Sequence, residues 1–309
     1  MQKEKVIVIA GPTASGKTAL SIELAKKIDG EIVSADSMQI YKDMDIGTAK
    51  VTNEEMQGIN HHLIDFVNPD ERYSVADYKK DAKKAIKEIL KKGKVPIIVG
   101  GTGLYINSLI YEIDYNEIEQ DLKYREELEN TVEEKGLNYL YKRAVEIDSQ
   151  AMEKISINDK KRIMRVLEIY HSTGKTKTQL EKESRLNPVE YDYKIFAIDM
   201  DRSVLYDRIN RRVDIMIENG LIDEVKYILK KYENFPTAMQ GLGYKEVVEY
   251  LNNILTKEEM IEKIKQESRR YAKRQLTWFR KIDNINWLDG LNNIQDNVNK
   301  IIGVYRRLN

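Results

Sequence analysis

The chain has 309 residues, of which 41% are hydrophobic and 33% are charged, and its 51 basic residues balance 51 acidic ones. This is the composition of a globular protein with a sizeable core, and its net charge gives no argument for an anionic partner. The chain has no cysteine and only three histidines, which excludes disulfides and thiolate zinc sites and speaks against a histidine cage for zinc.

The N-terminal residues predict a cytoplasmic protein. Residues 1–5 lead directly into an apolar, strand-like run and lack the apolar stretch and cleavage site of a secretory signal. No apolar run in the chain reaches the length of about twenty residues that spans a bilayer. We therefore expect no membrane insertion.

A phosphate-binding loop follows the first predicted strand, at residues 6–10, and precedes a predicted helix at 17–27. The loop has the sequence pattern of a phosphate-binding loop, in which a glycine is followed by four residues and then by Gly-Lys-Thr. The glycines let backbone N–H groups and the helix N-terminus face a phosphate, Lys17 adds a positive charge, and Thr18 can ligate Mg²⁺. The pattern predicts a polyphosphate site but does not say which polyphosphate it holds. The loop residues are Gly11, Pro12, Thr13, Ala14, Ser15, Gly16, Lys17 and Thr18.

Polar residues also follow the next two predicted strands, at 31–35 and 95–99, and a charged helix is predicted at 78–92 before the second of them. Asp36 and Thr102 stand at the carboxyl ends of these strands, where open parallel sheets bind ligands. Asp36 could hold Mg²⁺ through water or accept a proton from a nucleophile, and a turn or helix-capping role is its structural alternative. The glycine-rich segment around Thr102 equally fits a tight turn.

The rest of the chain predicts an interrupted core. Residues 112–188 contain no convincing strand, whereas strand patterns return at 194–198 and 285–288. Helices are predicted at 204–219, 222–232 and 257–281. We predict an α/β fold with a P-loop NTPase-like parallel sheet, formed by residues 1–112 and 188–309, and a helical insertion domain at 113–187.

Two basic clusters are candidate nucleic-acid contacts. Residues 269–281 contain six basic and no acidic residues, with Arg270, Arg274 and Trp278 at helical spacing. In the insertion, residues 160–165 form a basic stripe opposite an acidic stretch at 112–134. A single charge run is usually a solvated surface, but two clusters beside one phosphate site favour a nucleic acid.

Seven motifs together resemble those of bacterial tRNA dimethylallyltransferases, the IPP transferase family. The matches run in order from about Val6 to Arg280, and the small departures at Asn60 and Tyr78 affect no proposed catalytic position. The motifs are GPTASGKT, SADSMQIYKDMDIGTAK, HHLID, VGGTGLY, RVDIMIENGLIDEV, GLGYKE and AKRQLTWFR.

The resemblance implies transfer of a dimethylallyl group from dimethylallyl diphosphate to the exocyclic amine of the adenosine 3′ of the anticodon in tRNA, with release of diphosphate. The phosphate loop would bind this leaving group, with Lys17 and Mg²⁺ at Thr18 stabilising its charge. Arg208 and Arg212 match diphosphate-contacting positions, although an exposed arginine pair is mostly solvated. Asp36 matches the proposed general base, and Thr102 lies near the same reaction centre.

The resemblance also implies a bound anticodon arm whose target base leaves its stack. Lys273 and Arg274 are added to the tRNA-contacting set from charge alone. The positions that match the family's tRNA contacts are Asp36, Ser37, Met38, Gln39, Thr102, Arg125, Lys161, Arg162, Ile163, Met164 and Arg165.

Two other functions fit part of the pattern. A small-molecule or nucleoside kinase would also use the phosphate loop, the parallel sheet and a helical lid. A GTPase-type RNA-binding switch lacks support because the chain has no Asn-Lys-x-Asp signature. For the preferred function, we expect tRNA and dimethylallyl diphosphate as partners and a monomeric protein.

Overall fold

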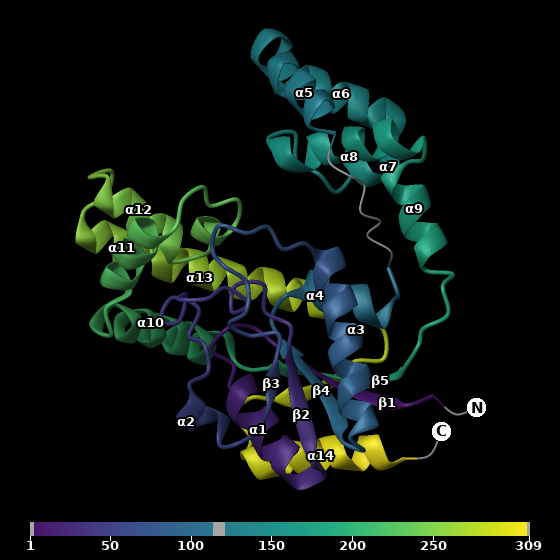
Figure 1. The fold of residues 1–309 in the computed structure, drawn as a ribbon, viewed down its shortest axis with the longest axis vertical. Coiled ribbons are helices and arrows are strands. Elements are labelled where there is room, and N and C mark those ends of the chain that lie inside the picture. The colour runs from purple at the N-terminus through teal and green to yellow at the C-terminus, as the bar shows by residue number, and fades with distance from the viewer. Residues whose placement is uncertain (1–2, 114–120, 308–309) are drawn as a thin grey trace. The chain divides into compact units, whose positions relative to one another are not determined.

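The structure, a computed structural model, describes residues 3–113 and 121–307. It divides the chain into a larger unit, Met1–Ile106 with Tyr191–Asn309, and a smaller unit, Asn107–Glu190. The limits of the smaller unit lie a few residues from 113 and 187, the predicted limits of the insertion. Residues 114–120, part of that insertion and of its acidic stretch, lie outside the described residues (Figure 1).

The larger unit is built on one parallel sheet of six strands in the order β3-β2-β4-β1-β5-β6. The predicted α/β fold and five of its strands are confirmed. The sixth, β3, has only two residues and pairs with Ile32 and Val33 at the sheet edge, so it was too short to give a periodic signal. The strands are β1 (Lys5–Ala10), β2 (Gly30–Ser34), β3 (His61–His62), β4 (Val95–Gly100), β5 (Asp192–Asp199) and β6 (Asn286–Asp289).

The central strands are buried between neighbouring strands of the sheet and the helices that pack on it. Strand β1 lies between β4 and β5, with Ile7 opposite Ile97 and Ile9 opposite Phe196. These four side chains are inaccessible to solvent and belong to one hydrophobic cluster that includes residues of α1 (Lys17–Ile28) and α14 (Ile294–Arg306). Their burial explains the continuous apolar runs of the central strands.

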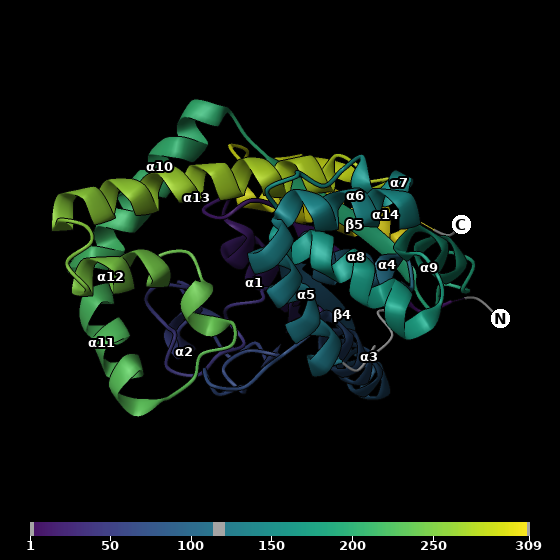
Figure 2. The same cartoon turned by 90° about the horizontal axis from the view of Figure 1, so that it is seen from above.

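Helices cover the sheet and extend beyond it. α1 packs against β4 and α14, and α3 packs against β2 and β4. Figure 2 shows α13 running beside α10, and α11 and α12 continue this helical group. The predicted helices of this unit are confirmed within a few residues. The bounds are α2 (Asn53–Met56), α3 (Val75–Lys91), α10 (Arg202–Glu218), α11 (Leu221–Lys231), η1 (Ala238–Gln240), α12 (Tyr244–Leu251) and α13 (Lys257–Phe279).

The smaller unit is helical across its described residues, 107–113 and 121–190. Its core contains Leu128, Leu140, Ile163 and Leu167, all nearly inaccessible to solvent. α4 (Gly103–Ile110) begins in the larger unit and ends in the smaller one. The remaining helices are α5 (Leu122–Lys135), α6 (Leu137–Ile147), α7 (Ser149–Met152), α8 (Lys160–Thr173) and α9 (Lys177–Ser184).

Candidate active site

A pocket of about 380 Å³ in the larger unit brings together segments that lie far apart in the sequence. It is lined by the phosphate loop, the residues after β2 and β4, α10, residues 240–245 and α13. The carboxyl ends of parallel strands therefore form one wall, as the sheet topology requires. The predicted site residues among its lining are Thr13, Lys17, Thr18, Asp36, Ser37, Met38, Gln39, Arg212 and Arg274.

The phosphate loop curls through two left-handed residues. Ala14 has φ 63° and Gly16 has φ 89°, and Gly16 stands directly before α1. Left-handed residues turn successive N–H groups toward one concave side, and the first turn of a helix leaves its own N–H groups available there. The loop is thus shaped to receive an anion above Lys17 and Thr18.

Lys17, Arg212 and Asp36 are three interacting charged groups of the pocket lining. Burial lowers the pKa of Lys17 to about 8, an effect that the Asp36 carboxylate opposes and Arg212 reinforces. Burial also lowers the pKa of Arg212, again against the influence of Asp36. Lys17 Nζ donates to the carbonyl of Pro12 at 2.7 Å. Two partly desolvated cations beside one carboxylate favour an incoming polyanion.

Asp36 stabilises a turn, the structural alternative given for it in the sequence, and it also lines the pocket. Its Oδ1 accepts from the N–H groups of Met38 (2.9 Å) and Gln39 (3.4 Å), which closes a turn after β2. Thr102 Oγ1 accepts from the N–H of Ser37 at 3.0 Å. Thr102 is not among the pocket-lining residues, but this bond connects it to the turn that carries Asp36.

Gln275 was not predicted, yet it connects two loops of the site. Its Oε1 accepts from the N–H of Thr13 (3.0 Å) and its Nε2 donates to the carbonyl of Gly101 (2.9 Å). A Cβ on Gly101 would lie 2.1 Å from this Nε2, so a side chain there would displace the glutamine. The sequence had singled out residues 269–281 for their positive charge and residues 272–280 as a family motif, but it had given Gln275 no role.

Tyr271 is a second residue that sequence reasoning missed. It lies one helical turn before Gln275 and lines the same pocket. Burial, together with the Asp36 carboxylate, raises its pKa to about 12, against hydrogen bonding to Thr102 and the charge of Arg274. A neutral phenol is therefore present beside Asp36 and Thr102 at physiological pH.

Several predicted residues lie away from this pocket. Arg208 and Lys273 are exposed and do not line it. Arg125, Lys161, Arg162 and Arg165 belong to the smaller unit. There Arg125 and Arg165 both pair with Glu168, at 3.0 and 3.5 Å.

Ile163 and Met164, also predicted to contact tRNA, are buried in the core of the smaller unit. Contact with RNA at these two positions would therefore involve the backbone rather than the side chain.

The donors in the pocket fit a hard cation bound together with a polyphosphate. Thr18 offers a hydroxyl at the start of α1, and Asp36 offers a carboxylate. In the described part of the chain, no group of three or more His, Cys, Asp or Glu could hold a metal ion. Mg²⁺ suits such a site because it keeps several waters and is usually bound by one or two protein oxygens and phosphate oxygens.

A parallel α/β sheet with an anion-binding loop after its first strand defines a protein of the phosphate-loop class. The family model described as IPP transferase matches residues 39–282, so the chain belongs to the IPP transferase family.

Similar proteins cover nearly the whole chain. A tRNA dimethylallyltransferase of Acetivibrio thermocellus is 53% identical over 93% of this chain and 92% of its own length. The crystal structure of a tRNA isopentenylpyrophosphate transferase from Bacillus halodurans matches with a TM-score of 0.74 at 44% identity, covering 98% of this chain and 97% of that one. A eukaryotic dimethylallyltransferase acting on tRNA matches with a TM-score of 0.81 at 32% identity, covering 97% and 80%.

None of the helices among the described residues is both long and apolar enough to cross a membrane.

Proposed function

We propose that the protein transfers the dimethylallyl group of dimethylallyl diphosphate to the exocyclic amine of the adenosine 3′ of the anticodon in tRNA. The observation that carries this proposal is that an anion-binding loop and the turn of Asp36 line the same pocket. The chain belongs to the IPP transferase family, and similar proteins are named tRNA dimethylallyltransferase. The relatives do not favour the kinase alternative.

In the proposed reaction, a bond forms between the adenine amine nitrogen and the allylic carbon as the carbon–oxygen bond to diphosphate breaks. The electron pair of that bond leaves with diphosphate. Lys17, the loop N–H groups and Arg212 would stabilise the negative charge that grows on the leaving oxygen. Mg²⁺ bound by Thr18 and the diphosphate would neutralise part of the same charge.

Asp36 is the proposed general base. The lone pair of an adenine amine is delocalised into its ring, so the nitrogen must lose a proton as it attacks. Asp36 lines the pocket that holds Lys17, and its turn is fixed by Thr102. In this proposal Thr102 orients the Asp36 turn and the incoming base.

We propose tRNA contacts in each of the two units. Arg274 lines the pocket with an exposed side chain, and Lys161, Arg162 and Arg165 are exposed on α8. These residues would bind backbone phosphates of the anticodon arm while its target base is extruded. Because one chain supplies every proposed role, we propose that the protein is a monomer, and sedimentation velocity would check this. We also propose that it acts in the cytoplasm, where tRNA is modified.

Release of diphosphate tests the function against the kinase alternative. We expect purified protein with Mg²⁺, dimethylallyl diphosphate and unmodified tRNA to release diphosphate, with no release when tRNA is omitted. With ATP and small acceptors but no RNA, we expect no turnover of ATP. ATP consumption without tRNA, together with no tRNA-dependent diphosphate release, would favour the kinase.

A further inference from the structure

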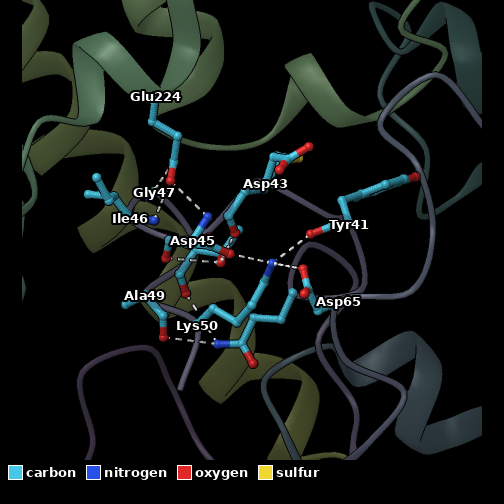
Figure 3. A network of polar contacts seen from close by, with 12 residues as sticks. Tyr41, Asp43, Asp45, Ile46, Gly47, Ala49, Lys50, Asp65 and Glu224 are labelled. Atoms are coloured by element: carbon cyan, nitrogen blue, oxygen red, sulfur yellow. Dashed lines mark hydrogen bonds and ion pairs between the residues drawn. The ribbon is translucent and has the colours of Figure 1, made fainter. Parts of the chain in front are cut away.

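The segment from Gln39 to Lys50 leaves the turn of Asp36 and is held in place from inside by Lys50 (Figure 3). The Lys50 side chain is only 7% exposed and its Nζ donates to the carbonyl of Tyr41 (2.7 Å) and to the carboxylates of Asp45 (2.5 Å) and Asp65 (2.6 Å). The bond to Tyr41 joins the two ends of the segment, the bond to Asp45 reaches its middle, and the bond to Asp65 fixes it to a residue outside the segment. None of these bonds fixes the segment to the helical group of α10 to α13.

Glu224, in the first turn of α11, connects the segment to this helical group. Its Oε2 accepts from the N–H groups of Asp45 (2.8 Å) and Ile46 (2.6 Å), and its Oε1 accepts from the N–H of Gly47 (3.0 Å). One carboxylate thus occupies three consecutive N–H groups, as an anion does in a backbone nest. Figure 3 shows Glu224 reaching from its helix to these groups.

Tyr244 completes the arrangement. Its hydroxyl donates to Glu224 Oε1 at 2.8 Å, and its ring packs so closely on the segment that a Cβ on Gly47 would lie 2.5 Å from it. Glu224 therefore receives four hydrogen bonds, and the backbone of residues 45–47 can adopt this position only with glycine at 47.

The carbonyl groups of Thr48 and Ala49, the next residues of the segment, accept hydrogen bonds from side chains that line the pocket. Arg212 Nη2 donates to the carbonyl of Thr48 at 3.1 Å. Gln39 Nε2 donates to the carbonyls of Thr48 and Ala49, both at 3.2 Å. The position of residues 45–49 thus determines where the Arg212 guanidinium is held, and Arg212 lines the pocket together with Lys17.

We infer that Glu224 is a positioning residue for the diphosphate site, which acts by fixing residues 45–49 and through them the Arg212 guanidinium. The inference rests on the proposed function. Glu224 does not line the pocket, so its effect on diphosphate must pass through the segment. Without the carboxylate, three N–H groups would lose their acceptor and the Thr48 carbonyl would no longer hold Arg212 in one orientation.

A double-mutant cycle measured by calorimetric titration with inorganic pyrophosphate and Mg²⁺ tests the inference. In Glu224→Gln the amide keeps one oxygen acceptor and places an N–H donor against N–H groups of the segment. We expect affinity to fall about tenfold relative to the unchanged chain, close to the lower end of the range for a lost hydrogen bond to a charged group.

Asp223→Asn is the matched control. It removes the same charge from the same helical turn, but Asp223 is 81% exposed and pairs with Lys226. We expect its pyrophosphate affinity to equal that of the unchanged chain.

Coupling to Arg212 separates positioning from a general loss of structure. If Glu224 acts through Arg212, Glu224→Gln/Arg212→Ala binds pyrophosphate no more weakly than Arg212→Ala alone. If the two losses multiply, or if Glu224→Gln binds as tightly as Asp223→Asn, the inference is wrong. Absence of pyrophosphate binding by the unchanged chain would instead overturn the proposed diphosphate site, and the inference with it.

Tyr244→Phe serves if Glu224→Gln does not fold. It removes one of the four hydrogen bonds and leaves the carboxylate in place. We expect a loss of affinity of about two- to threefold, again absent when Arg212 is alanine. An unchanged affinity in Tyr244→Phe would then count against the inference.

Discussion

Lys17 is the residue whose charge links the phosphate loop to its ligand. Its pKa of about 8 arises mainly from burial. A bound diphosphate would favour the charged lysine and raise this pKa. Binding above pH 8 therefore requires Lys17 to take up a proton.

We expect the affinity for dimethylallyl diphosphate to be constant below pH 8 and to fall by up to about tenfold per pH unit above it. Calorimetric titration between pH 7 and pH 9.5 measures this. Lys17→Met, which has no such proton to lose, should bind weakly at every pH without the decline. A decline of equal steepness in Lys17→Met would assign the titration to another group.

Asp36 is tested best by Asn, because Asn retains an oxygen that can accept from Met38 and Gln39. We expect Asp36→Asn to lower kcat by about two to four orders of magnitude, the range for loss of a general base. Its affinities for dimethylallyl diphosphate and tRNA should change little. Near-normal single-turnover rates with unchanged binding would show that Asp36 is not the base.

The sequence predicted Lys17 and Asp36 because each stands in a local pattern, a loop or a strand end, and it predicted Arg212 through the family resemblance. Gln275 and Glu224 lie inside two of the family motifs, but no local pattern gave either of them a role. Their importance comes from hydrogen bonds to residues more than 170 positions away in the chain, which only the folded structure reveals.

At the scale of elements, the edge of the sheet contains a buried ionic cluster. Glu31 on β2 is 1% exposed, and its carboxylate bonds His62 Nε2 (2.8 Å) on β3 and Lys92 Nζ (2.9 Å) after α3. Burial alone would raise its pKa, but hydrogen bonds from His62 and Lys92 dominate and lower the pKa from 4.5 to about 2. The cluster thus connects β3, the short strand that the sequence did not predict, to the sheet.

Glu31 should therefore stabilise the fold fully above about pH 4.5 and lose this contribution as the pH falls toward 2. We expect Glu31→Gln to be less stable by up to about 3 kcal/mol at pH 7, an upper value because Lys92 is partly exposed. The difference should shrink as the pH falls below 4.5. Urea unfolding at several pH values measures it.

Glu88→Gln, which removes the same charge from an exposed position of α3, is the control for that series. We expect it to unfold near the midpoint of the unchanged chain. A stability difference between Glu31→Gln and the unchanged chain that stays constant from pH 7 to pH 2.5 would contradict the role of Glu31.

At the scale of the whole molecule, hydrophobic patterns predicted the α/β fold and its interrupted core, because long buried strands and helices leave regular signals. They did not give the strand order, because residues of β1 pair with residues of β4 and β5 that lie 90 or more positions away. The motifs of the family resemblance supplied the function, which the fold alone would not decide.

The basic stripe on α8 is predicted to bind tRNA phosphates. Lys161→Ala/Arg162→Ala should weaken tRNA binding and make the slope of log K against log salt shallower by about one to two. Filter binding from 50 to 300 mM salt measures this slope. Lys142→Ala/Lys154→Ala, at exposed positions of the same unit, should leave it unchanged, and equal slopes in all three proteins would exclude the stripe as an RNA contact.

The central claim, prenyl transfer to tRNA, is tested most directly by the mass of the nucleosides after reaction. Unmodified tRNA is incubated with the protein, Mg²⁺ and dimethylallyl diphosphate, digested, and separated by liquid chromatography with mass spectrometry. We predict one adenosine per tRNA, next to the anticodon on its 3′ side, heavier by a C5H8 unit. Adenosines of unchanged mass, with protein that is folded and binds both substrates, would contradict the claim.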